Sequence, residues 1–402
     1  MKVLVINAGS SSIKYQLYDM PDRRVLAKGK VERIGDEQSE LAHTCGVETV
    51  TRKEPVADHE RAMQLILDIL TDPKAGAVAD LTEIATVGHR VVHGGEEFTG
   101  SIIVDDRVLA SVERFVDLAP LHNPHNLVGI RAAQAKLPHA IQVACFDTAF
   151  HTTLPEVAYM YALPFELYER FGVRRYGFHG TSHRYVARRA ATLTGIDKYQ
   201  SNTITCHLGN GCSIAAVQNG QSVDTSMGFT PLEGLVMGTR TGDFDPAILF
   251  YLANKGYDLA GLNTLCNKKS GLLGLSGASN DMRTLEQLAD EGNDRAKLAI
   301  EVFCYRVRKY LGSYFAVLND LHAIVLTGGI GENCPLVRKL ICQNLNQMGI
   351  ELDVSTNETV YGQEMAITTP DSKVAVLVIP TNEEQAIAGD AFELAAQVAK
   401  SP

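Results

Sequence analysis

The stretch Val3-Leu-Val-Ile-Asn-Ala-Gly-Ser-Ser-Ser-Ile-Lys14 stands near the start of the chain and decides how its first domain is built. Residues 3–6 are an apolar run, residues 7–12 are a turn rich in glycine and serine, and residues 13–18 alternate apolar with polar side chains. Two strand-like runs joined by a short glycine turn predict a β-hairpin. A third strand is predicted over residues 25–34.

A hairpin of the same kind recurs in the middle of the chain. Residues 203–207 predict a strand, residues 208–211 a glycine turn and residues 213–217 the returning strand. Asn219-Gly220 then favours a tight turn. This internal repeat predicts two domains of similar topology, each beginning with a glycine-turn hairpin. We expect the first domain to comprise residues 1–150 plus 383–402, and the second to comprise residues 151–382.

Helix start signals lie between and after the two hairpins. Strands are also predicted over residues 141–145 and 323–326, so strands and helices alternate as in an α/β protein. The predicted helices run from Asn123-Pro124 to Leu137, from Thr181 or Ser182 to Leu193, from Asp245-Pro246 to about Gly256, from Asn333 to before Gly349, and from Asn382 onward.

Composition narrows the class of protein. With 402 residues, of which 45% are hydrophobic and 21% charged, the chain is expected to be globular with two domains. A formal net charge of −10 argues against a nucleic-acid binder. No apolar run has the length of a signal-peptide core or a membrane span, so no membrane partner is expected. The eight cysteines form no C-x-x-C pair, which indicates reduced, mostly buried thiols and a cytoplasmic protein.

The two glycine turns are candidate phosphate-binding sites. Glycine and serine leave backbone N–H groups accessible, and Lys14 follows the first turn as a nearby cation. Asn7 and Asn210 add amide groups beside the glycines. The alternative is that each segment is only a hairpin turn. A P-loop is excluded because no G-x-x-x-x-G-K-[ST] occurs, and Gly209-x-Gly211 lacks the third glycine of a dinucleotide-binding turn.

Four basic residues are candidates for binding an anion. His122 and His179 each precede a predicted helix, where the helix dipole favours negative charge. Arg90 and Arg240 lie among glycines, where a guanidinium can contact two oxygens at once. Each of the four could instead be a structural hydrogen-bonding residue.

Metal ligands and carboxylates leave several alternatives open. His179 and His183 have the spacing of helical zinc ligands, but a glycine stands where such a motif needs its general base. Asn7 and Glu383 are candidates for holding magnesium, although Glu383 could merely complement a helix dipole. Asp147 follows a predicted strand and could be a base, a positioning group for an arginine, or a cap.

Further motifs extend these segments along the chain. They are Tyr176-Gly-Phe-His-Gly-Thr-Ser-His183, His207-Leu-Gly-Asn-Gly211, Asp224-Thr-Ser-Met227, Thr230-Pro-Leu-Glu-Gly234, Gly238-Thr-Arg240, Thr327-Gly-Gly-Ile-Gly-Glu-Asn333 and Pro380-Thr-Asn-Glu383. Together with the opening stretch they closely resemble the acetokinase family, which belongs to the superfamily of acetate and sugar kinases, heat-shock proteins and actin. The resemblance covers nearly the whole chain in order and is weak only over residues 37–58 and the last few residues.

The resemblance implies two duplicated ribonuclease-H-like domains of the actin-like ATPase fold, with a cleft between them, and a homodimer. It also implies a reversible, Mg²⁺-dependent phosphoryl transfer between ATP and acetate, with Mn²⁺ as an alternative ion. The products in that direction are acetyl phosphate and ADP, so the implied partners are these small molecules.

The resemblance also assigns roles by motif. Arg90, Arg240, His179 and Asp147 would be catalytic, with His122 in a secondary role, and Asn7 and Glu383 would support the metal ion. The substrate would be bound by Arg90, Val92, Leu121, Phe178 and Pro231. The nucleotide would be bound by Lys14, His207, Leu208, Gly209, Asn210, Gly211, Asp281, Met282, Arg283, Gly329, Ile330, Gly331, Glu332 and Asn333.

The chemistry of a carboxylate acceptor fits this set of residues. A carboxylic acid with a pKa of roughly 4 to 5 is already ionised at neutral pH and needs no general base. The difficulty is to bring an anion up to a polyphosphate, which calls for arginines, histidine and magnesium. We therefore expect direct in-line transfer without a phosphoenzyme, with Asp147 as an orienting group.

Competing functions remain within and outside the family. A propionate or butyrate kinase of the same family is the alternative, and Val92, which narrows the acceptor pocket, favours acetate. A non-enzymatic ATP switch leaves the paired arginines without a purpose, and a sugar kinase fits less well. Cys212 stands where similar sequences often have a smaller residue, and its thiol predicts activity that is sensitive to thiol reagents.

Overall fold

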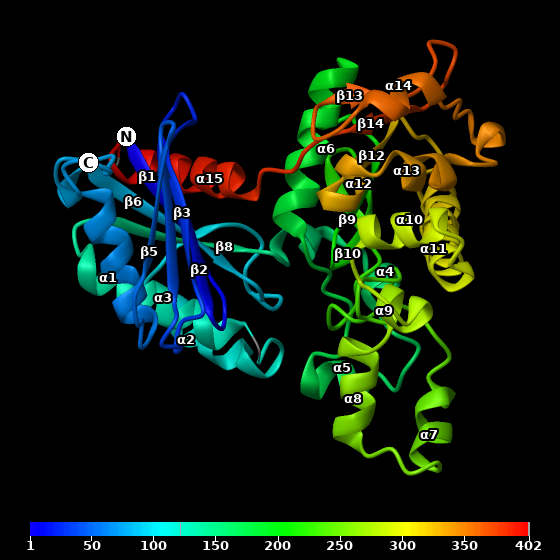
Figure 1. The fold of residues 1–402 in the computed structure, drawn as a ribbon, viewed down its shortest axis with the longest axis horizontal. Coiled ribbons are helices and arrows are strands. Elements are labelled where there is room, and N and C mark those ends of the chain that lie inside the picture. The colour runs from blue at the N-terminus through cyan, green and yellow to red at the C-terminus, as the bar shows by residue number, and fades with distance from the viewer. Residues whose placement is uncertain (121, 401–402) are drawn as a thin grey trace. The chain divides into compact units, whose positions relative to one another are not determined.

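The computed structural model describes residues 1–120 and 122–400 and divides the chain into two compact units (Figure 1). Unit 1 comprises Met1–Ala149 with Asn382–Pro402, and unit 2 comprises Phe150–Thr381. None of the helices in the described part of the chain is long and apolar enough to cross a membrane.

Unit 1 contains an eight-stranded sheet in the order β5-β4-β3-β2-β1-β6-β8-β7. The opening stretch forms the predicted hairpin, in which β1 and β2 are antiparallel and the turn is closed by the Gly9 N–H donating to the Ser12 carbonyl at 2.8 Å. Strands β6 and β8 continue the sheet parallel to β1. The strands are β1 Lys2–Ala8, β2 Ser12–Asp19, β3 Arg24–Glu32, β4 Glu40–Cys45, β5 Glu48–Lys53, β6 Ile84–Val91, β7 Ile102–Ile103 and β8 Ile141–Phe146.

Strand β1, near the centre of the unit 1 sheet, is buried on both faces. Leu4 and Ile6 share a core with α1 and α3, whereas Val3 and Val5 pack with the last helix, α15. This explains why residues 3–6 are continuously apolar, since a strand covered on both sides needs no polar face. The helices are α1 His59–Leu70, α2 Asp106–Arg114, α3 Asn123–Lys136 and α15 Glu383–Val398.

Unit 2 repeats this topology in a six-stranded sheet of order β11-β10-β9-β12-β14-β13. Its antiparallel strands β9, β10 and β11 correspond to β1, β2 and β3, and its parallel strands β12 and β14 correspond to β6 and β8. The predicted duplicated, ribonuclease-H-like α/β fold is thereby confirmed. The strands are β9 Thr203–Leu208, β10 Cys212–Gln218, β11 Gln221–Thr225, β12 Ala323–Thr327, β13 Met365–Ala366 and β14 Ala375–Val378.

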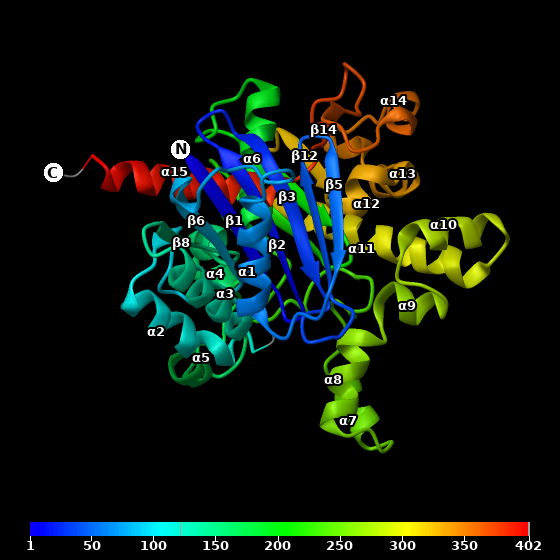
Figure 2. The same cartoon turned by 60° about the vertical axis from the view of Figure 1, so that its left-hand side comes forward.

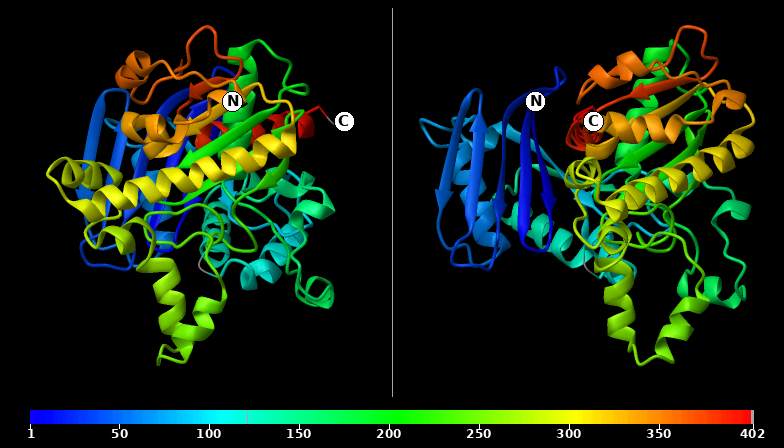
Figure 3. Two further views of the ribbon diagram at one scale, coloured as in Figure 1. Left: turned by 90° about the vertical axis from the view of Figure 1, so that its right-hand side faces the viewer. Right: turned by 45° about the vertical axis from the view of Figure 1, so that its right-hand side comes forward.

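Helices cover both faces of the unit 2 sheet. Val186 and Ala190 of α6 pack on Ala323 and Val325 of β12, and the long helix α11 lies on the other face (Figure 3). Helices α7 and α8 form a pair that extends away from the unit 2 sheet (Figure 2). The helices are α4 Glu156–Tyr159, α5 Glu166–Phe171, α6 Gly180–Thr194, α7 Ala247–Ala253, α8 Leu259–Lys268, α9 Gly271–Ser276, α10 Met282–Asp290, α11 Asp294–Leu318, α12 Gly328–Asn333, α13 Pro335–Cys342 and α14 Val354–Thr359.

Several predicted helix starts are shifted because their polar side chains have other partners. Asn123 is the first residue of α3 and not its cap, since its buried amide donates to the His93 carbonyl at 3.0 Å. Neither Thr181 nor Ser182 caps α6, because the helix already begins after His179. Asn333 ends α12 and does not start α13. Asn382 caps α15 as predicted and accepts from the Gln385 N–H at 3.0 Å.

Candidate active site

Arg90 and Asp147 meet at the carboxyl ends of β6 and β8. Arg90 is paired in register with Cys145, and Asp147 follows two residues later, just beyond the end of β8. The guanidinium donates to both carboxylate oxygens, with Nε to Oδ1 at 3.1 Å and Nη2 to Oδ2 at 2.5 Å. The Asp147 side chain is 2% exposed. Its carboxylate therefore orients the Arg90 guanidinium, which fits the positioning interpretation of Asp147.

Glu383 stands beside this ion pair at the start of α15. Its Oε2 lies 4.0 Å from Arg90 Nε, and Asn7 Oδ1 accepts from Arg90 Nη1 at 3.4 Å. Burial raises the pKa of the Glu383 carboxyl to about 7, opposed by Arg90 and reinforced by the nearby carboxylates of Asp147 and Glu384. Three carboxyl groups thus surround one guanidinium, an excess of negative charge that a divalent cation would relieve.

The remaining predicted residues of unit 1 lie in different surroundings. Lys14 is opposite Asn7 in the β1–β2 ladder and lines a hollow of about 260 Å³ over the sheet. Val92 is buried, and its backbone N–H donates to Asn126 Oδ1 at 3.1 Å. His122 is the exposed residue before α3. Leu121 lies outside the described residues.

In unit 2, His179 and Arg240 converge above the glycine turn that follows β9. A methyl group added at Gly211 would stand 3.6 Å from both Arg240 Nη1 and His179 Nε2, so glycine keeps this point open. Arg240 Nη1 also donates to the Pro231 carbonyl at 3.2 Å. Among the described residues no carboxylate pairs with Arg240, and burial lowers the pKa of its guanidinium. A half-buried cation without a counter-ion is suited to an anionic ligand.

The His179 backbone is in the left-handed region, with φ 55° and ψ 25°. A positive φ is uncommon for residues other than glycine, although asparagine, aspartate and histidine adopt it more often than the rest, and such conformations cluster at functional sites. The His179 ring stacks on the His207 ring, with centroids 4.3 Å apart. The side chain of the preceding residue, Phe178, is buried, and the Phe178 carbonyl accepts from His151 Nε2 at 3.0 Å.

The three predicted nucleotide segments are joined by a side-chain hydrogen bond and by close packing of the backbone. Asn210 Oδ1 accepts from Asn280 Nδ2 at 2.9 Å, which links the turn after β9 to the segment 281–283 before and in α10. Asp281 caps α10 by accepting from the N–H of Arg283 at 2.9 Å. The first residue of α12, Gly328, packs so closely on Leu208 that a Cβ would meet the Leu208 carbonyl at 2.7 Å.

Glu332, in the segment Gly329–Asn333 of α12, has a structural partner for its carboxylate. Its Oε1 accepts from the N–H of Gly328 at 2.8 Å and from the N–H of Thr381 at 3.2 Å. The carboxylate thus holds the turn between β12 and α12. Glu332 therefore shapes this segment through its side chain, and any contribution to an anionic ligand would come from neighbouring backbone groups.

Sequence reasoning missed the polar residues that surround His179. Ser213 lies between the rings of His179 and His183, and Thr205 contacts the far side of His183. The zinc interpretation of His183 does not fit, since both of its ring nitrogens are engaged by hydroxyls. Among the described residues, no group of three histidine, cysteine or acidic side chains is arranged to hold a metal ion. The available signal was one hydroxyl residue, Thr205 or Ser213, inside each of two mainly apolar strands.

Cys212, next to Gly211, does not carry a reactive thiol in this structure. The residue is fully buried, and its Sγ donates to the Gly209 carbonyl at 3.0 Å. Burial raises the pKa of the Cys212 thiol to about 12. Since the thiolate is the reactive form, the structure argues against the predicted sensitivity to thiol reagents.

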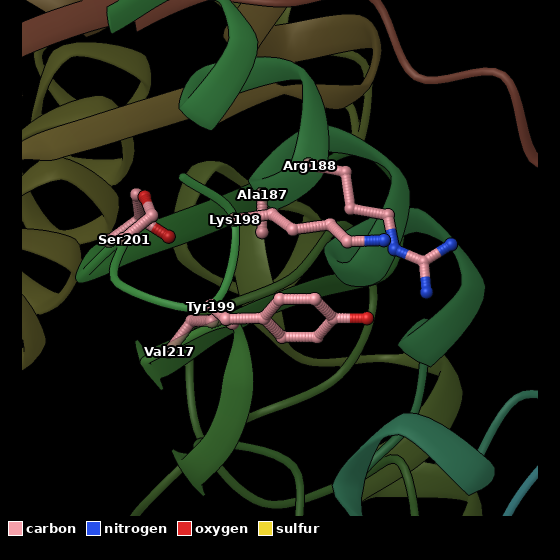
Figure 4. A pocket seen from close by; sticks show the side chains of 8 residues that line it. Ala187, Arg188, Lys198, Tyr199, Ser201 and Val217 are labelled. Carbon is pink, nitrogen blue, oxygen red and sulfur yellow. The ribbon is translucent and has the colours of Figure 1, made fainter. Parts of the chain in front are cut away.

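A separate small cavity lies between α6, β9 and β10, on a part of unit 2 that holds none of the predicted site residues. Its volume is about 40 Å³, and Figure 4 shows Ala187, Lys198 and Tyr199 around it. The hydroxyls of Ser201 and Thr203 line it and are buried, with no hydrogen-bond partner among the described residues. A cavity of this size beside polar groups is suited to bound water.

One ribonuclease-H-like unit holds an oriented arginine. The other holds a histidine and an arginine over a glycine turn, and this arginine has no carboxylate partner among the described residues. This combination is typical of a phosphotransferase. The chain belongs to the acetokinase family, which it matches over residues 2–389. It is 54% identical to the acetate kinase of Thermotoga maritima, and the match covers all of both chains.

Solved structures give the same result. The crystal structure of Porphyromonas gingivalis acetate kinase is similar with a TM-score of 0.95 at 48% identity, over 98% of this chain and 99% of that chain. A propionate kinase from Francisella tularensis is similar with a TM-score of 0.91 at 41% identity, over 98% and 99% of the two chains. Family membership thus sets a carboxyl group as the phosphoryl acceptor.

Proposed function

We propose that this protein is an acetate kinase, which transfers a phosphoryl group reversibly between ATP and acetate and forms acetyl phosphate and ADP. The observation that carries the proposal is the open point above Gly211, 3.6 Å from both Arg240 Nη1 and His179 Nε2. A cation and an imidazole aimed at one point favour the charge that spreads over the phosphoryl oxygens during transfer.

The residues that we propose for the chemical step bind and orient charge. Arg240 and His179 would contact the transferring phosphoryl group, and Arg90 would contact the acceptor carboxylate. Asp147 would hold Arg90 in place and would not act as a base, because acetate is already ionised at neutral pH. We expect direct in-line transfer without a phosphoenzyme, and a phosphorylated enzyme that passes its group to acetate at the rate of turnover would contradict this step.

Magnesium fits the acidic surroundings of Arg90. Asn7 and Glu383 would hold the ion directly or through water, and the raised pKa of Glu383, caused by burial and by the neighbouring carboxylates, is consistent with a site that a divalent cation would neutralise. A bound divalent ion supplies charge neutralisation for the nucleotide phosphates. His122 remains a secondary candidate on the resemblance alone.

The identity of the acceptor is the point at which a second function competes. A propionate kinase is among the similar solved structures, at 41% identity. One methylene in an apolar pocket separates two substrates by only about 1 to 3 kcal/mol, so overlapping activity is expected. We propose that Val92 limits the pocket, so kcat/KM should fall in the order acetate, propionate, butyrate. A maximum at propionate or butyrate would overturn the assignment.

The activity itself can be tested by trapping. ATP, Mg²⁺, acetate and hydroxylamine should yield acetohydroxamate, which forms from acetyl phosphate. Arg90→Ala and Arg240→Ala should each raise the barrier by about 2 to 4 kcal/mol, because each removes a positive group that acts on the transition state. Arg107→Ala is the control, since Arg107 is an exposed arginine paired with Asp105 at 3.1 Å. Near-normal turnover of a folded Arg240→Ala variant would contradict the role of that residue.

Assembly and location are proposed on separate observations. No side chain of α7 is buried, although its sequence Ala-Ile-Leu-Phe-Tyr-Leu-Ala is mainly apolar, and Phe250 is 72% exposed. An apolar surface of this kind favours a protein contact, and we propose a homodimer that uses it. Sedimentation of Phe250→Glu as a monomer would support this. The eight cysteines are all free thiols, which favours a reducing compartment such as the cytoplasm.

A further inference from the structure

Four side chains from β9, β10 and the start of α6 form a continuous hydrogen-bonded chain that ends on His179. The Thr205 hydroxyl lies 2.7 Å from His183 Nδ1, and His183 Nε2 lies 2.7 Å from the Ser213 hydroxyl. The same Ser213 oxygen lies 2.8 Å from His179 Nδ1. Thr205, His183 and Ser213 are all fully buried, so water does not compete with these bonds. We call this set the hydroxyl–imidazole relay.

Two proton arrangements place the single hydroxyl proton of Ser213 in a hydrogen bond to one of the two imidazoles. If both imidazoles donated to Ser213, its buried proton would have no acceptor among the described residues. In the first, Thr205 donates to His183 Nδ1, His183 Nε2 donates to Ser213, and Ser213 donates to His179 Nδ1. In the second, every bond is reversed and His179 donates from Nδ1. Burial lowers the pKa of His183 well below its usual value, so its imidazole is neutral and has one N–H in either case.

The first direction leaves no buried proton without an acceptor. In the second, His183 would donate to Thr205, and the Thr205 hydroxyl proton would have no acceptor among the described residues. An unmet buried donor of this kind is unfavourable, because the hydroxyl loses the hydrogen bond that water provides in the unfolded chain. The buried end of the relay therefore determines which nitrogen of His179 carries the proton.

We propose that the relay makes Thr205, His183 and Ser213 positioning residues, which hold His179 as the tautomer with its proton on Nε2, the nitrogen that faces the open point above Gly211. This inference rests on the proposed contact of His179 with the phosphoryl group. With the proton on Nε2, His179 donates to a phosphoryl oxygen. With the proton on Nδ1, it would present a lone pair to that oxygen and repel it.

Other groups around the relay leave this arrangement intact. The His207 ring stacks on His179, and its Nδ1 is engaged by the Ser182 hydroxyl at 2.9 Å. His151 contacts the edge of His183 but has its own partners, Ser222 and the Phe178 carbonyl. Arg240 is the cation that faces His179 across the point above Gly211. None of these groups supplies a second hydrogen bond to Ser213.

Paired variants test the proposal. Ser213→Ala removes the donor to His179 and should lower kcat on the order of 10- to 100-fold with little change in the KM for ATP. The reason is that His179 would then contact the phosphoryl group less well in the transition state. Ser213→Thr keeps the hydroxyl and should restore most of the rate. Thr205→Val should lower kcat in the same way. Thr203→Val is its matched control, because Thr203 lies two residues away on β9, is also buried, and has no hydrogen-bond partner among the described residues.

The tautomer of His179 is a direct readout, because it would not change if Ser213 had only a structural role. In the folded wild-type protein, ¹⁵N shifts of His179 should show the proton on Nε2, and Ser213→Ala should mix the two tautomers. A second control is Ser222→Ala, which removes a hydroxyl bonded to the buried His151 at 2.7 Å and should leave the His179 tautomer unchanged.

The possible results separate the two proposals. If His179 carries its proton on Nδ1, or if Ser213→Ala keeps both the wild-type tautomer and the wild-type kcat, the relay inference is wrong while the kinase assignment stands. If His179→Ala turns over acetate at the normal rate, the proposed role of His179 fails first. Equal losses in Thr203→Val and Thr205→Val would show a packing effect and would also overturn the inference.

Discussion

At the scale of single residues, Gly211 determines what Arg240 and His179 can reach. A Cβ at this position would meet both side chains at 3.6 Å, which is ordinary van der Waals contact, so an added methyl should not disturb the fold. The methyl would instead occupy the point at which the two groups converge. Gly211 is thus required by the ligand and not by the backbone.

Gly211→Ala should therefore separate activity from stability. We expect kcat/KM to fall at least 10-fold, by analogy with the loss of one transition-state contact, while the melting temperature changes little. Gly312→Ala is the control, because Gly312 lies in α11 with open space around it. Unchanged kcat/KM in Gly211→Ala would show that no ligand occupies this point.

Cys212 shows how burial decides the behaviour of one side chain. Its pKa of about 12 leaves almost no thiolate at neutral pH. Iodoacetamide should therefore leave Cys212 unmodified in the folded protein, as measured by mass spectrometry, and label it after unfolding. Rapid labelling of Cys212 under native conditions would contradict the burial of this thiol.

At the scale of elements, the packing of α15 on β6 brings Glu383 to Arg90. Gly88 of β6 lies under this helix, and a Cβ there would stand 2.7 Å from Ile387 Cγ2 and 3.3 Å from Ala391 Cβ. The close approach depends on the missing side chain. A change at Gly88 is consequently transmitted to Glu383 through the helix and not by direct contact.

Gly88→Ala should push α15 outward. Overpacking of this kind is unfavourable by about 1 to 3 kcal/mol, and the shifted helix should raise the Mg²⁺ concentration that half-saturates activity. Urea unfolding and a Mg²⁺ titration measure the two effects. The control is Gly389→Ala on the same helix, where an added methyl meets nothing within 4 Å. If a destabilised Gly88→Ala variant keeps the normal Mg²⁺ dependence, the position of α15 does not affect the metal site and the prediction is wrong.

At the scale of the whole molecule, buried histidines set the response to acid. Burial lowers the pKa of His89, His93 and His151 to about 4 each, and that of His183 further below the usual value. Between pH 6.5 and 4 the unfolded chain takes up protons at these positions and the folded chain does not. Stability therefore falls as the pH falls through this window, by about 1.4 kcal/mol per pH unit for each histidine.

This linkage can be measured as a slope. The free energy of unfolding should decrease from pH 6.5 to 4, and His89→Gln should reduce that slope by about one proton, whatever its stability at neutral pH. The raised pKa values of Glu383, Asp224 and Glu286 act in the opposite direction and reduce the net slope. A flat profile over this window would contradict the buried, neutral state of the histidines.

Local patterns were sufficient to predict the two hairpins but not every element, since β4, β5, α1 and α11 were not predicted. The apolar run 3–6, the glycine turn and the repeat at 203–217 predicted the two hairpins, because strand period and turn chemistry are local properties. Helix starts were predicted less well. Asn123 and Ser182 have side chains that favour a cap, but each makes a distant hydrogen bond instead, which no local rule contains.

Within the site, the sequence predicted which residues take part but not which of them contact one another. The sequence motifs predicted Arg90, Asp147, His179 and Arg240 as site residues, because arginine and histidine among glycines indicate an anion-binding site. The ion pair between Asp147 and Arg90 forms because the parallel strands β6 and β8 end at the same edge of the sheet.

The sequence by itself thus determined the duplicated hairpins, the family and the kinds of side chain that serve it. Only the tertiary structure decided that Ser213 stands between two imidazoles, that the Cys212 thiol is sealed from solvent, and that Glu383 lies among carboxylates. The physical reason is that protonation state and hydrogen-bond direction depend on partners distant in the chain and on exclusion of water, and folding alone sets both.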